Sequence, residues 1–169
     1  SSERKGILKS YENDNKRLKS TGVFSIDASL NYLFTRAKEK DINFNLSINA
    51  DVTALTNIIN ENDLNTLILD LGENAIIATA ETQKKNILIV FSMLNESICL
   101  DIFDSANLFA PSVLSNFGIR RITTRKKSGG SGIGLMTTFE LMKKYDASFS
   151  VDETLENESY TKKVSVCFD

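Results

Sequence analysis

The feature that most restricts the fold of this chain is a glycine-rich segment near residue 130. Gly129, Gly130, Gly132 and Gly134 place half of the eight glycines of the sequence within six residues, and a helical pattern over 135–145 follows. Glycine permits a positive φ and a close backbone approach to a ligand, and the N-terminus of a helix attracts anions. The segment predicts a loop that holds a phosphate chain, although a flexible loop before a surface helix has the same composition.

Size and charge limit the general class of the protein. The chain has 169 residues, of which 41% are hydrophobic, which is enough for one domain with a buried core. Its 20 basic and 22 acidic side chains give a net charge of −2, so the charge balance favours neither nucleic acid nor an acidic membrane as a partner. Because no segment has the length of a membrane span or signal core, we expect the chain itself not to be inserted in a membrane.

The histidine and cysteine counts exclude several kinds of catalytic site. The sequence has no histidine, so these residues cannot form a histidine-based nucleophilic site or a histidine-ligated zinc site. Cys99 and Cys167 lie far apart in alternating segments, where we expect each to be a lone buried thiol in a reducing, cytoplasmic compartment. The remaining chemistry is that of carboxylates, amides, Mg²⁺ and backbone donors.

Apolar periodicity predicts the helices. Apolar side chains recur at helical spacing over about 27–40, with Ser25 or Asp27 as the N-cap, and over about 61–81. Pro111 begins a shorter helical pattern that Gly118 ends. The pattern over 135–145 makes the last predicted helix.

Alternation of apolar and polar residues predicts strands over about 42–48, 147–153 and 161–168, and the apolar segments over about 86–94 and 97–103 predict two more. These two are joined through Asn95 and Glu96 and form an antiparallel hairpin. This order of elements predicts an α+β fold, a two-layer α/β sandwich whose mainly antiparallel sheet carries its helices on one face.

Two polar residues flank the buried stripe of the long helix. Asp70 and Asn74 are four residues apart and therefore project side by side. An amide oxygen is a suitable Mg²⁺ ligand, and a carboxylate one turn earlier can orient a water or an attacking group. The alternative is that both, with Glu73, form the solvated side of an amphipathic helix.

Asp104 ends the strand that begins near residue 97. A carboxylate in this position can accept a hydrogen bond from an exocyclic amine, such as that of adenine, at the mouth of an apolar pocket. An aspartate at the end of a strand is also common in turns, so this residue alone does not decide between the two interpretations.

Three segments together resemble the N, G1 and G2 boxes of the GHKL ATPase superfamily, and most closely those of sensor histidine kinase catalytic domains. The segments are Asp70-Leu71-Gly72-Glu73-Asn74-Ala75, Phe103-Asp104-Ser105-Ala106 and Gly130-Ser131-Gly132-Ile133-Gly134-Leu135. The resemblance covers about 27–168 and implies a Bergerat-type sandwich that binds Mg·ATP, with Asn74 on Mg²⁺, Asp104 on the adenine amine and Asp70 where other branches place a catalytic glutamate. The ATP-binding residues that it implies are Asn74, Ala78, Asp104, Ala106, Thr124, Arg125, Gly130, Ser131, Gly132, Ile133, Gly134 and Leu135.

The same resemblance implies a division of the chain and a set of partners. Residues 1–20 would be the end of an upstream dimerisation and phosphoacceptor helix, residues 21–169 the catalytic domain, and residues 108–128 its ATP lid. The γ-phosphoryl group would pass to a histidine outside this sequence and then to a response regulator. The full-length protein would be a homodimer anchored in a membrane, with this domain in the cytoplasm.

The sequence departs from the family pattern after Asp104, and this departure leaves other functions open. Ala106 and Leu108 stand where the family usually has glycine, which should stiffen the start of the lid. The alternatives are a serine kinase of the anti-sigma type and a nucleotide-sensing module without catalysis. A dinucleotide-binding fold, with Asp152 on the ribose, fits less well because Leu135 takes the place of the third glycine. A Walker-type loop lacks its Lys-Ser or Lys-Thr.

Overall fold

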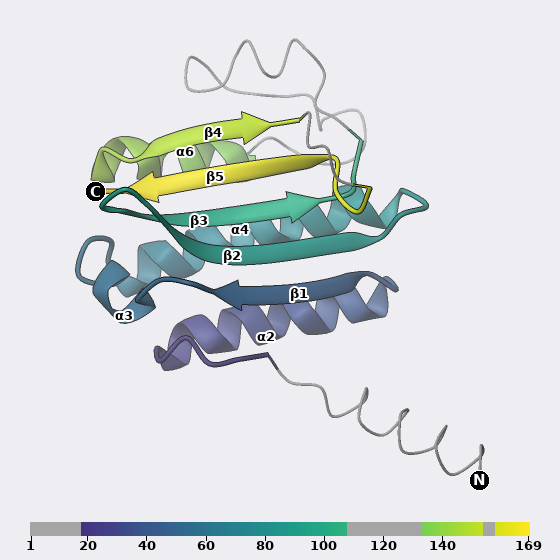
Figure 1. The fold of residues 1–169 in the computed structure, drawn as a ribbon, viewed down its shortest axis with the longest axis horizontal. Helices are drawn as coiled ribbons and strands as arrows, with labels where there is room; N and C mark the ends of the chain where they lie inside the picture. Colours follow the sequence, from purple (N-terminus) through teal and green to yellow (C-terminus); the bar gives the residue numbers. More distant parts are fainter. Residues whose placement is uncertain (1–17, 108–132, 154–157) are drawn as a thin grey trace, which may run out of the picture.

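The computed structural model describes residues 18–107, 133–153 and 158–169 (Figure 1). The predicted helix that begins at Pro111, the lid and most of the glycine segment lie outside these residues. The described elements are α2 (Phe24–Glu39), β1 (Asn43–Ile48), α3 (Val52–Leu55), α4 (Glu61–Ala80), β2 (Asn86–Leu94), β3 (Ser97–Asp104), α6 (Ile133–Tyr145), β4 (Ser148–Asp152) and β5 (Lys162–Phe168).

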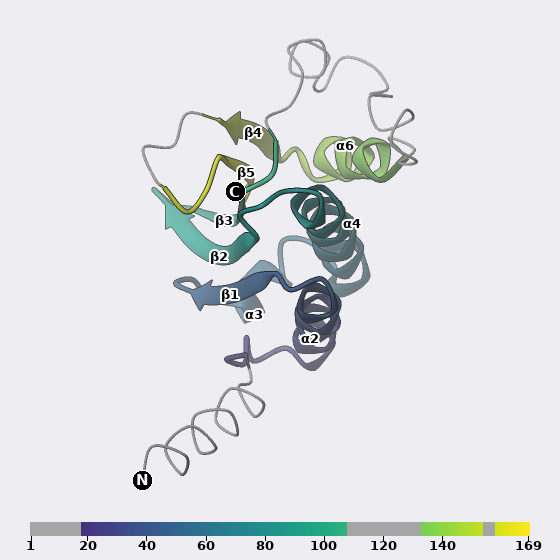
Figure 2. The same cartoon turned by 90° about the vertical axis from the view of Figure 1, so that its right-hand side faces the viewer.

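The strands form one five-stranded sheet in the order β1-β2-β3-β5-β4. β1 is parallel to β2, and the other three pairings are antiparallel. Helices α2, α4 and α6 all lie on one side of the sheet (Figure 2). This confirms the predicted α+β sandwich with a mixed, mainly antiparallel sheet.

The core lies between α4 and the middle of the sheet. Alternate side chains of β2, Ile87, Ile89 and Phe91, are fully buried, as are Leu64 and Leu67 on α4. The period of two in the strand and the period of about 3.6 in the helix each leave one apolar face, and both faces are buried in the same layer. α4 therefore has a fixed rotation about its axis, which decides where its polar residues point.

The beginning of α2 differs from the prediction. The N-cap is Val23, whose side chain caps nothing, and neither Ser25 nor Asp27 holds this position. The Asp27 carboxylate instead accepts hydrogen bonds from the Thr21 backbone N–H at 2.7 Å and from the Ser20 hydroxyl at 2.6 Å. Asp27 therefore fixes the segment that enters the helix, a different way of holding a helix start from the predicted cap.

Gly72 lets α2 and α4 pack closely. A Cβ atom at this position would lie 2.4 Å from Cδ1 and 2.9 Å from Cδ2 of Leu33 on α2. Leu33 is fully buried, so its side chain has little room to move away. A side chain at position 72 would therefore push the two helices apart.

We expect Gly72→Ala to destabilise the protein by up to about 2 kcal/mol, because overpacking costs about 1–3 kcal/mol and the gain in helix propensity returns only about 1 kcal/mol. Urea unfolding of the purified protein measures the change. Thr66→Ala, at an exposed position of the same helix, is the matched control and should not destabilise. If Gly72→Ala were as stable as the wild type, the two helices would not need this close contact.

α6 is tied to the first turn of α4 through Asp63. The carboxylate accepts a hydrogen bond from Lys144 at 2.7 Å and another from the Tyr145 hydroxyl. These two hydrogen bonds, that of Lys144 first, lower the pKa of Asp63. The tie positions the helix that follows the glycine segment relative to the helix that carries Asn74.

The structure corrects the expectation of two free thiols. Cys99 on β3 and Cys167 on β5 are direct neighbours across the antiparallel pair and form a disulfide. The sequence separation of 68 residues hid this pairing, which only the strand order reveals. The prediction of a reducing compartment rested on two free thiols, and the disulfide takes away that support.

Reduction of the disulfide should lower the free energy of unfolding by about 2–4 kcal/mol, because the oxidised link restricts the unfolded chain. Urea unfolding with and without dithiothreitol measures the loss. The Cys99→Ala/Cys167→Ala variant should show no response to the reductant. Equal stability of the oxidised and reduced wild type would contradict a disulfide between β3 and β5 in the purified protein.

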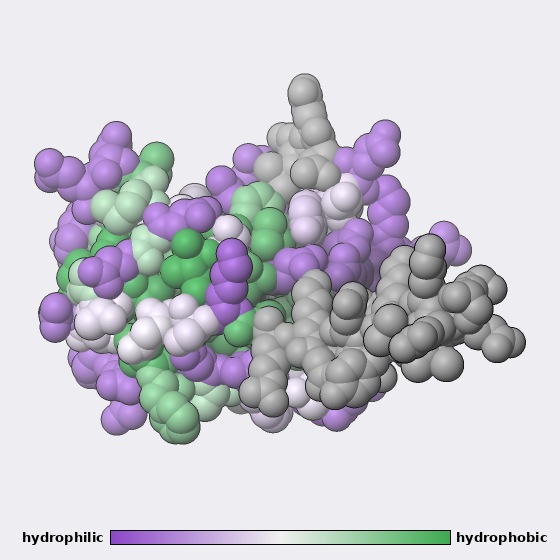
Figure 3. Space-filling model, turned by 60° about the horizontal axis from the view of Figure 1, so that its bottom comes forward, coloured by the Kyte–Doolittle hydropathy of each residue, from purple (hydrophilic) through white to green (hydrophobic). Residues whose placement is uncertain are grey.

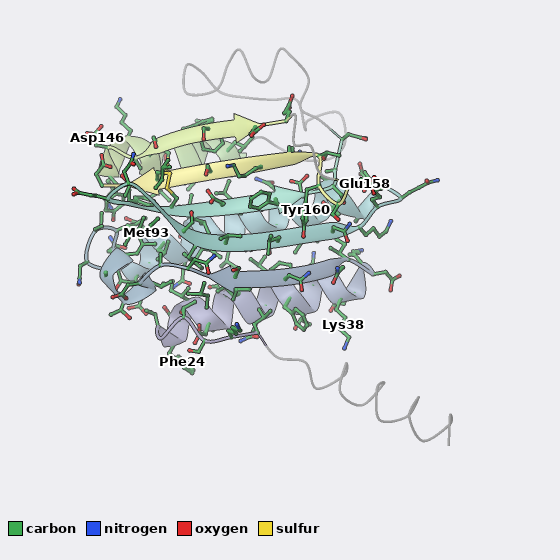
Figure 4. The ribbon with its side chains drawn as sticks, viewed as in Figure 1. Phe24, Lys38, Met93, Asp146, Glu158 and Tyr160 are labelled. Carbon is green, nitrogen blue, oxygen red and sulfur yellow. A yellow bond between two sulfur atoms is a disulfide. The ribbon has the colours of Figure 1, made fainter. Side chains whose placement is uncertain are left out.

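The surface of the described part carries few large apolar side chains. The most exposed are Phe24, 90% exposed, and Leu94, 61% exposed. Figure 4 places Phe24 and Met93 toward the same end of the molecule, and Figure 3 shows apolar groups there interrupted by polar ones. Within the described ranges, no helix combines the length and apolar character needed to cross a membrane.

Candidate functional site

A pocket opens between α4 and the inner face of the sheet. The described residues that line it are Leu71, Asn74, Ala75, Ile102, Asp104, Leu135, Phe149, Lys162 and Val164. The lining is apolar except for Asn74, Asp104 and Lys162, a composition typical of small-ligand sites.

The walls of the pocket come from distant parts of the sequence. Ile102 and Val164 project from the neighbouring strands β3 and β5, at directly paired positions. Leu71 and Ala75 face them from α4, one turn apart, and Leu135 comes from the first turn of α6. Two apolar faces opposite each other suit a flat ring, and Asn74, Asp104 and Lys162 supply the polar groups that could select among such rings.

Asn74 brings an amide into the pocket from α4, between Leu71 and Ala75. Asp70 lies one turn earlier and is partly buried, but it is not among the described residues that line the pocket. Burial, and to a smaller extent the charge of Glu73, raises the pKa of Asp70. Ala78, one turn after Asn74, is partly buried and also lies outside the lining.

Asp104 is almost completely buried at the end of β3, with 2% of its surface exposed. Its Oδ1 accepts a hydrogen bond from the backbone N–H of Ala106 at 3.0 Å. Ala106 is 1% exposed and therefore belongs to the packed turn after the strand. The turn interpretation and the ligand interpretation of Asp104 are thus compatible, because the carboxylate both holds the turn and lines the pocket.

The end of β3 is held rigidly. The Thr161 backbone N–H donates to the Asp104 carbonyl at 2.8 Å, and the Thr161 hydroxyl donates to the Ala106 carbonyl. On the other side, the Ser105 hydroxyl accepts from the Asn86 N–H at 2.9 Å and donates to the Lys84 carbonyl at 2.7 Å. These bonds fix the direction in which the Asp104 side chain enters the pocket. Tyr160 and Glu158 mark the same end of the sheet in Figure 4.

Lys162 is a site residue that the sequence reasoning missed. Its Nζ lies 3.8 Å from Asp104 Oδ1, and both side chains are only 3% exposed. The Lys162 ammonium also donates to the Asn107 carbonyl at 3.2 Å. The signal was the period of two in the last strand, which puts Lys162 on the same face as Val164 and Val166 and therefore in the core.

The glycine segment is described only at its end. Ile133 and Gly134 are the first two residues of α6, and Leu135 lines the pocket. Thr124, Arg125, Gly130, Ser131 and Gly132 lie outside the described residues. The structure thus brings Asn74, Asp104 and Leu135, the last residue of the third motif, to one pocket.

The polar groups that line the pocket are compatible with a metal ion that is coordinated mainly by a bound phosphate chain and water. Within the described residues, no three histidine, cysteine, aspartate or glutamate side chains gather into a metal site. Mg²⁺ commonly uses one or two protein oxygens together with waters and substrate phosphates, so the Asn74 amide alone is compatible with Mg²⁺ bound along with a phosphate chain.

Solved structures show what this fold is similar to. No family model matches the sequence, and no curated protein matches it. The full-length ShkA structure in complex with AMPPNP is similar, with a TM-score of 0.64 and 17% identity over 90% of this chain. The chain spans only 30% of ShkA.

Separate catalytic domains match over most of their own length. The catalytic domain of the histidine kinase ThkA has a TM-score of 0.65 and 13% identity, covering 85% of this chain and 89% of ThkA. The Acinetobacter baumannii histidine kinase AdeS has a TM-score of 0.60 and 14% identity, and the match covers 94% of this chain and 71% of the AdeS chain. The chain therefore has the fold of histidine kinase catalytic domains, as the motifs suggested.

Proposed function

We propose, from the fold that it shares with histidine kinase catalytic domains, that this chain binds Mg·ATP and transfers the γ-phosphoryl group to a histidine. The observation that carries the proposal is the single pocket lined by Asn74, Asp104 and Leu135, one residue from each of the three motifs. The convergence of an amide, a carboxylate and apolar walls on one pocket supports a shared role in binding one ligand.

In this proposal the pocket binds the adenine base, and groups on α4 and at the N-terminus of α6 bind the Mg²⁺ and the phosphates. Asp104 accepts a hydrogen bond from the adenine amine, while Leu71, Ile102 and Val164 enclose the ring and exclude water. Asn74 lies where an amide oxygen can contribute to a bound Mg²⁺, which would neutralise charge on the phosphates. The N-terminus of α6 presents backbone N–H groups and a positive dipole end to the same anion.

The phosphoacceptor must come from outside these residues, because the sequence contains no histidine. We propose a dimerisation helix as its source and a response regulator as the next acceptor, within a homodimeric protein anchored in a membrane. The domain contributes positioning and electrostatic stabilisation, and the partner helix contributes the imidazole nucleophile.

A nucleotide-sensing module without catalysis is the second candidate. Two observations favour it: Ala106 is tightly packed where the family has a flexible glycine, and the Lys162 ammonium lies beside the Asp104 carboxylate. Both features limit movement at the base end of the pocket. Asn74 and the apolar walls, which a nucleotide would contact, are still present.

Calorimetric titration with Mg·ATP, with NADH as the control, tests the binding step. We expect ATP to bind at one site and NADH not to bind. Incubation with γ-labelled ATP and a histidine-bearing acceptor helix then tests transfer. Binding without transfer would support the sensing module, and absence of ATP binding would refute both candidates.

A further inference from the structure

We infer that Asp63 is a positioning residue for the phosphate end of the proposed nucleotide site, and that it acts by fixing the angle between α4 and α6. This inference rests on the proposed function, in which α4 carries the amide for Mg²⁺ and α6 begins beside the phosphates. Asp63 is not among the described residues that line the pocket. Its effect on a ligand must therefore be carried by the two helices.

The helices α4 and α6 lie side by side and meet at two separate places (Figure 2). Asn74 of α4 and Leu135 of α6 line the same pocket, whereas Asp63 of α4 is bonded to Tyr145 of α6. At about 1.5 Å per residue, the stretch from Asp63 to Asn74 spans about 17 Å and that from Leu135 to Tyr145 about 15 Å. The two helices are therefore antiparallel, and two contacts this far apart fix the angle between them.

The contact far from the pocket is a cluster of hydrogen bonds around one carboxylate. Asp63 Oδ2 accepts from Lys144 Nζ at 2.7 Å, from the Tyr145 hydroxyl, and from the Asn60 side-chain amide at 3.0 Å. The Tyr145 hydroxyl also accepts from the Asn60 backbone N–H at 3.3 Å. Asn60 is the N-cap of α4, and its side chain accepts from the Asp63 N–H. The last turn of α6 is thus bonded to the start of α4 through several groups.

The bond between Tyr145 and Asp63 is the strongest part of this cluster. The side chain of Asp63 is 21% exposed and Tyr145 is half-buried, whereas 56% of the Lys144 side chain is exposed. An exposed ion pair contributes little, because water screens it and a long side chain must be ordered. The phenol donates a charge-assisted hydrogen bond, and its ring has fewer rotatable bonds to fix than a lysine side chain.

The middle of α6 is the point about which the helix can turn. Thr138, Leu141 and Met142 are buried there, between the two ends of the helix. A rotation about these contacts would displace the two ends in opposite directions, so freedom at Tyr145 becomes freedom at Leu135. A displacement of about 1 Å is enough to weaken interactions that depend on orientation. The base should be affected much less, because its walls come mainly from α4 and the sheet.

Titration of the wild type and of Tyr145→Phe with Mg·ATP and with adenosine tests this role. Tyr145→Phe keeps the ring and removes only the hydroxyl. We expect it to weaken Mg·ATP relative to adenosine by ~3- to 10-fold, which is no more than the loss of one hydrogen bond to a charged group. Asp63→Ala removes the shared acceptor and should reduce the same ratio of affinities by at least as much.

Tyr32→Phe is the matched control, because it makes the same substitution on α2, where Tyr32 is 48% exposed. It should leave the ratio of Mg·ATP affinity to adenosine affinity as in the wild type. The ratio is insensitive to partial unfolding, since a smaller folded fraction lowers both apparent affinities equally. A merely stabilising role of Asp63 would therefore leave the ratio unchanged.

The outcomes separate this inference from the proposed function. If either Tyr145→Phe or Asp63→Ala binds the two ligands in the wild-type ratio, Asp63 only stabilises the fold and the inference is wrong, while ATP binding stands. A wild type that binds adenosine as strongly as Mg·ATP also overturns it, because the phosphates would then gain nothing from the two helices. If the wild type binds neither ligand, the proposed function fails, and the inference fails with it.

Discussion

Asn74→Ala should reduce phosphoryl transfer to a histidine-bearing acceptor helix by ~100-fold or more, the effect expected when one electrostatic stabiliser of a transition state is lost. The amide lines the pocket from the middle of a long helix whose apolar face is buried independently of it. The variant should therefore keep its fold. Transfer rates with labelled ATP measure the loss, and Asn74→Asp, which retains an oxygen but changes the charge, should also lose transfer.

The dependence of ATP binding on Mg²⁺ distinguishes a metal role of Asn74 from a general packing role. ATP affinity of the wild type should differ between excess Mg²⁺ and excess chelator, and Asn74→Ala should lose most of that difference. Asn62→Ala, an exposed position on the same helix, is the matched control and should behave like the wild type. Wild-type transfer in Asn74→Ala would refute the assignment of Asn74 to Mg²⁺.

Asp104→Asn should weaken ATP binding by ~10- to 100-fold, as expected for the loss of a hydrogen bond to a charged group. Inorganic triphosphate should be affected far less, because it has no base to meet the buried carboxylate. Calorimetric titration of both ligands in the presence of Mg²⁺ measures the two affinities. Equal losses for ATP and triphosphate would show that Asp104 does not face adenine.

The ratio of the ATP affinity to the triphosphate affinity remains informative even if Asp104→Asn is less stable than the wild type. Asp104→Asn leaves the buried Lys162 ammonium without its carboxylate, and breaking a buried ion pair can destabilise a protein by about 3–5 kcal/mol. A smaller folded fraction lowers both apparent affinities equally. Thermal unfolding of the variant, measured beside the titrations, gives the size of this effect directly.

Local patterns predicted most of the fold. The apolar stripe of 61–81 predicted α4, and strict alternation over 42–48 predicted β1, because each element buries one face and its sequence period is that of the element itself. The short helix α3 had no such period and was not predicted. Helix starts were also less predictable, since Val23 precedes α2 without a capping side chain and Asp27 acts through contacts with the segment before the helix.

The sequence alone determined the residue types that a nucleotide site needs and the elements that carry them, since Asn74, Asp104 and the glycine segment stand in order on a helix, at a strand end and before a helix. Only the tertiary structure decided that Asn74, Asp104 and Leu135 share a pocket, that Lys162 lies beside Asp104, and that Cys99 pairs with Cys167. The physical reason is the order of the strands. Pairing β3 with β5 brings together residues that are about 60 to 70 positions apart, and no local sequence period encodes which strands become neighbours.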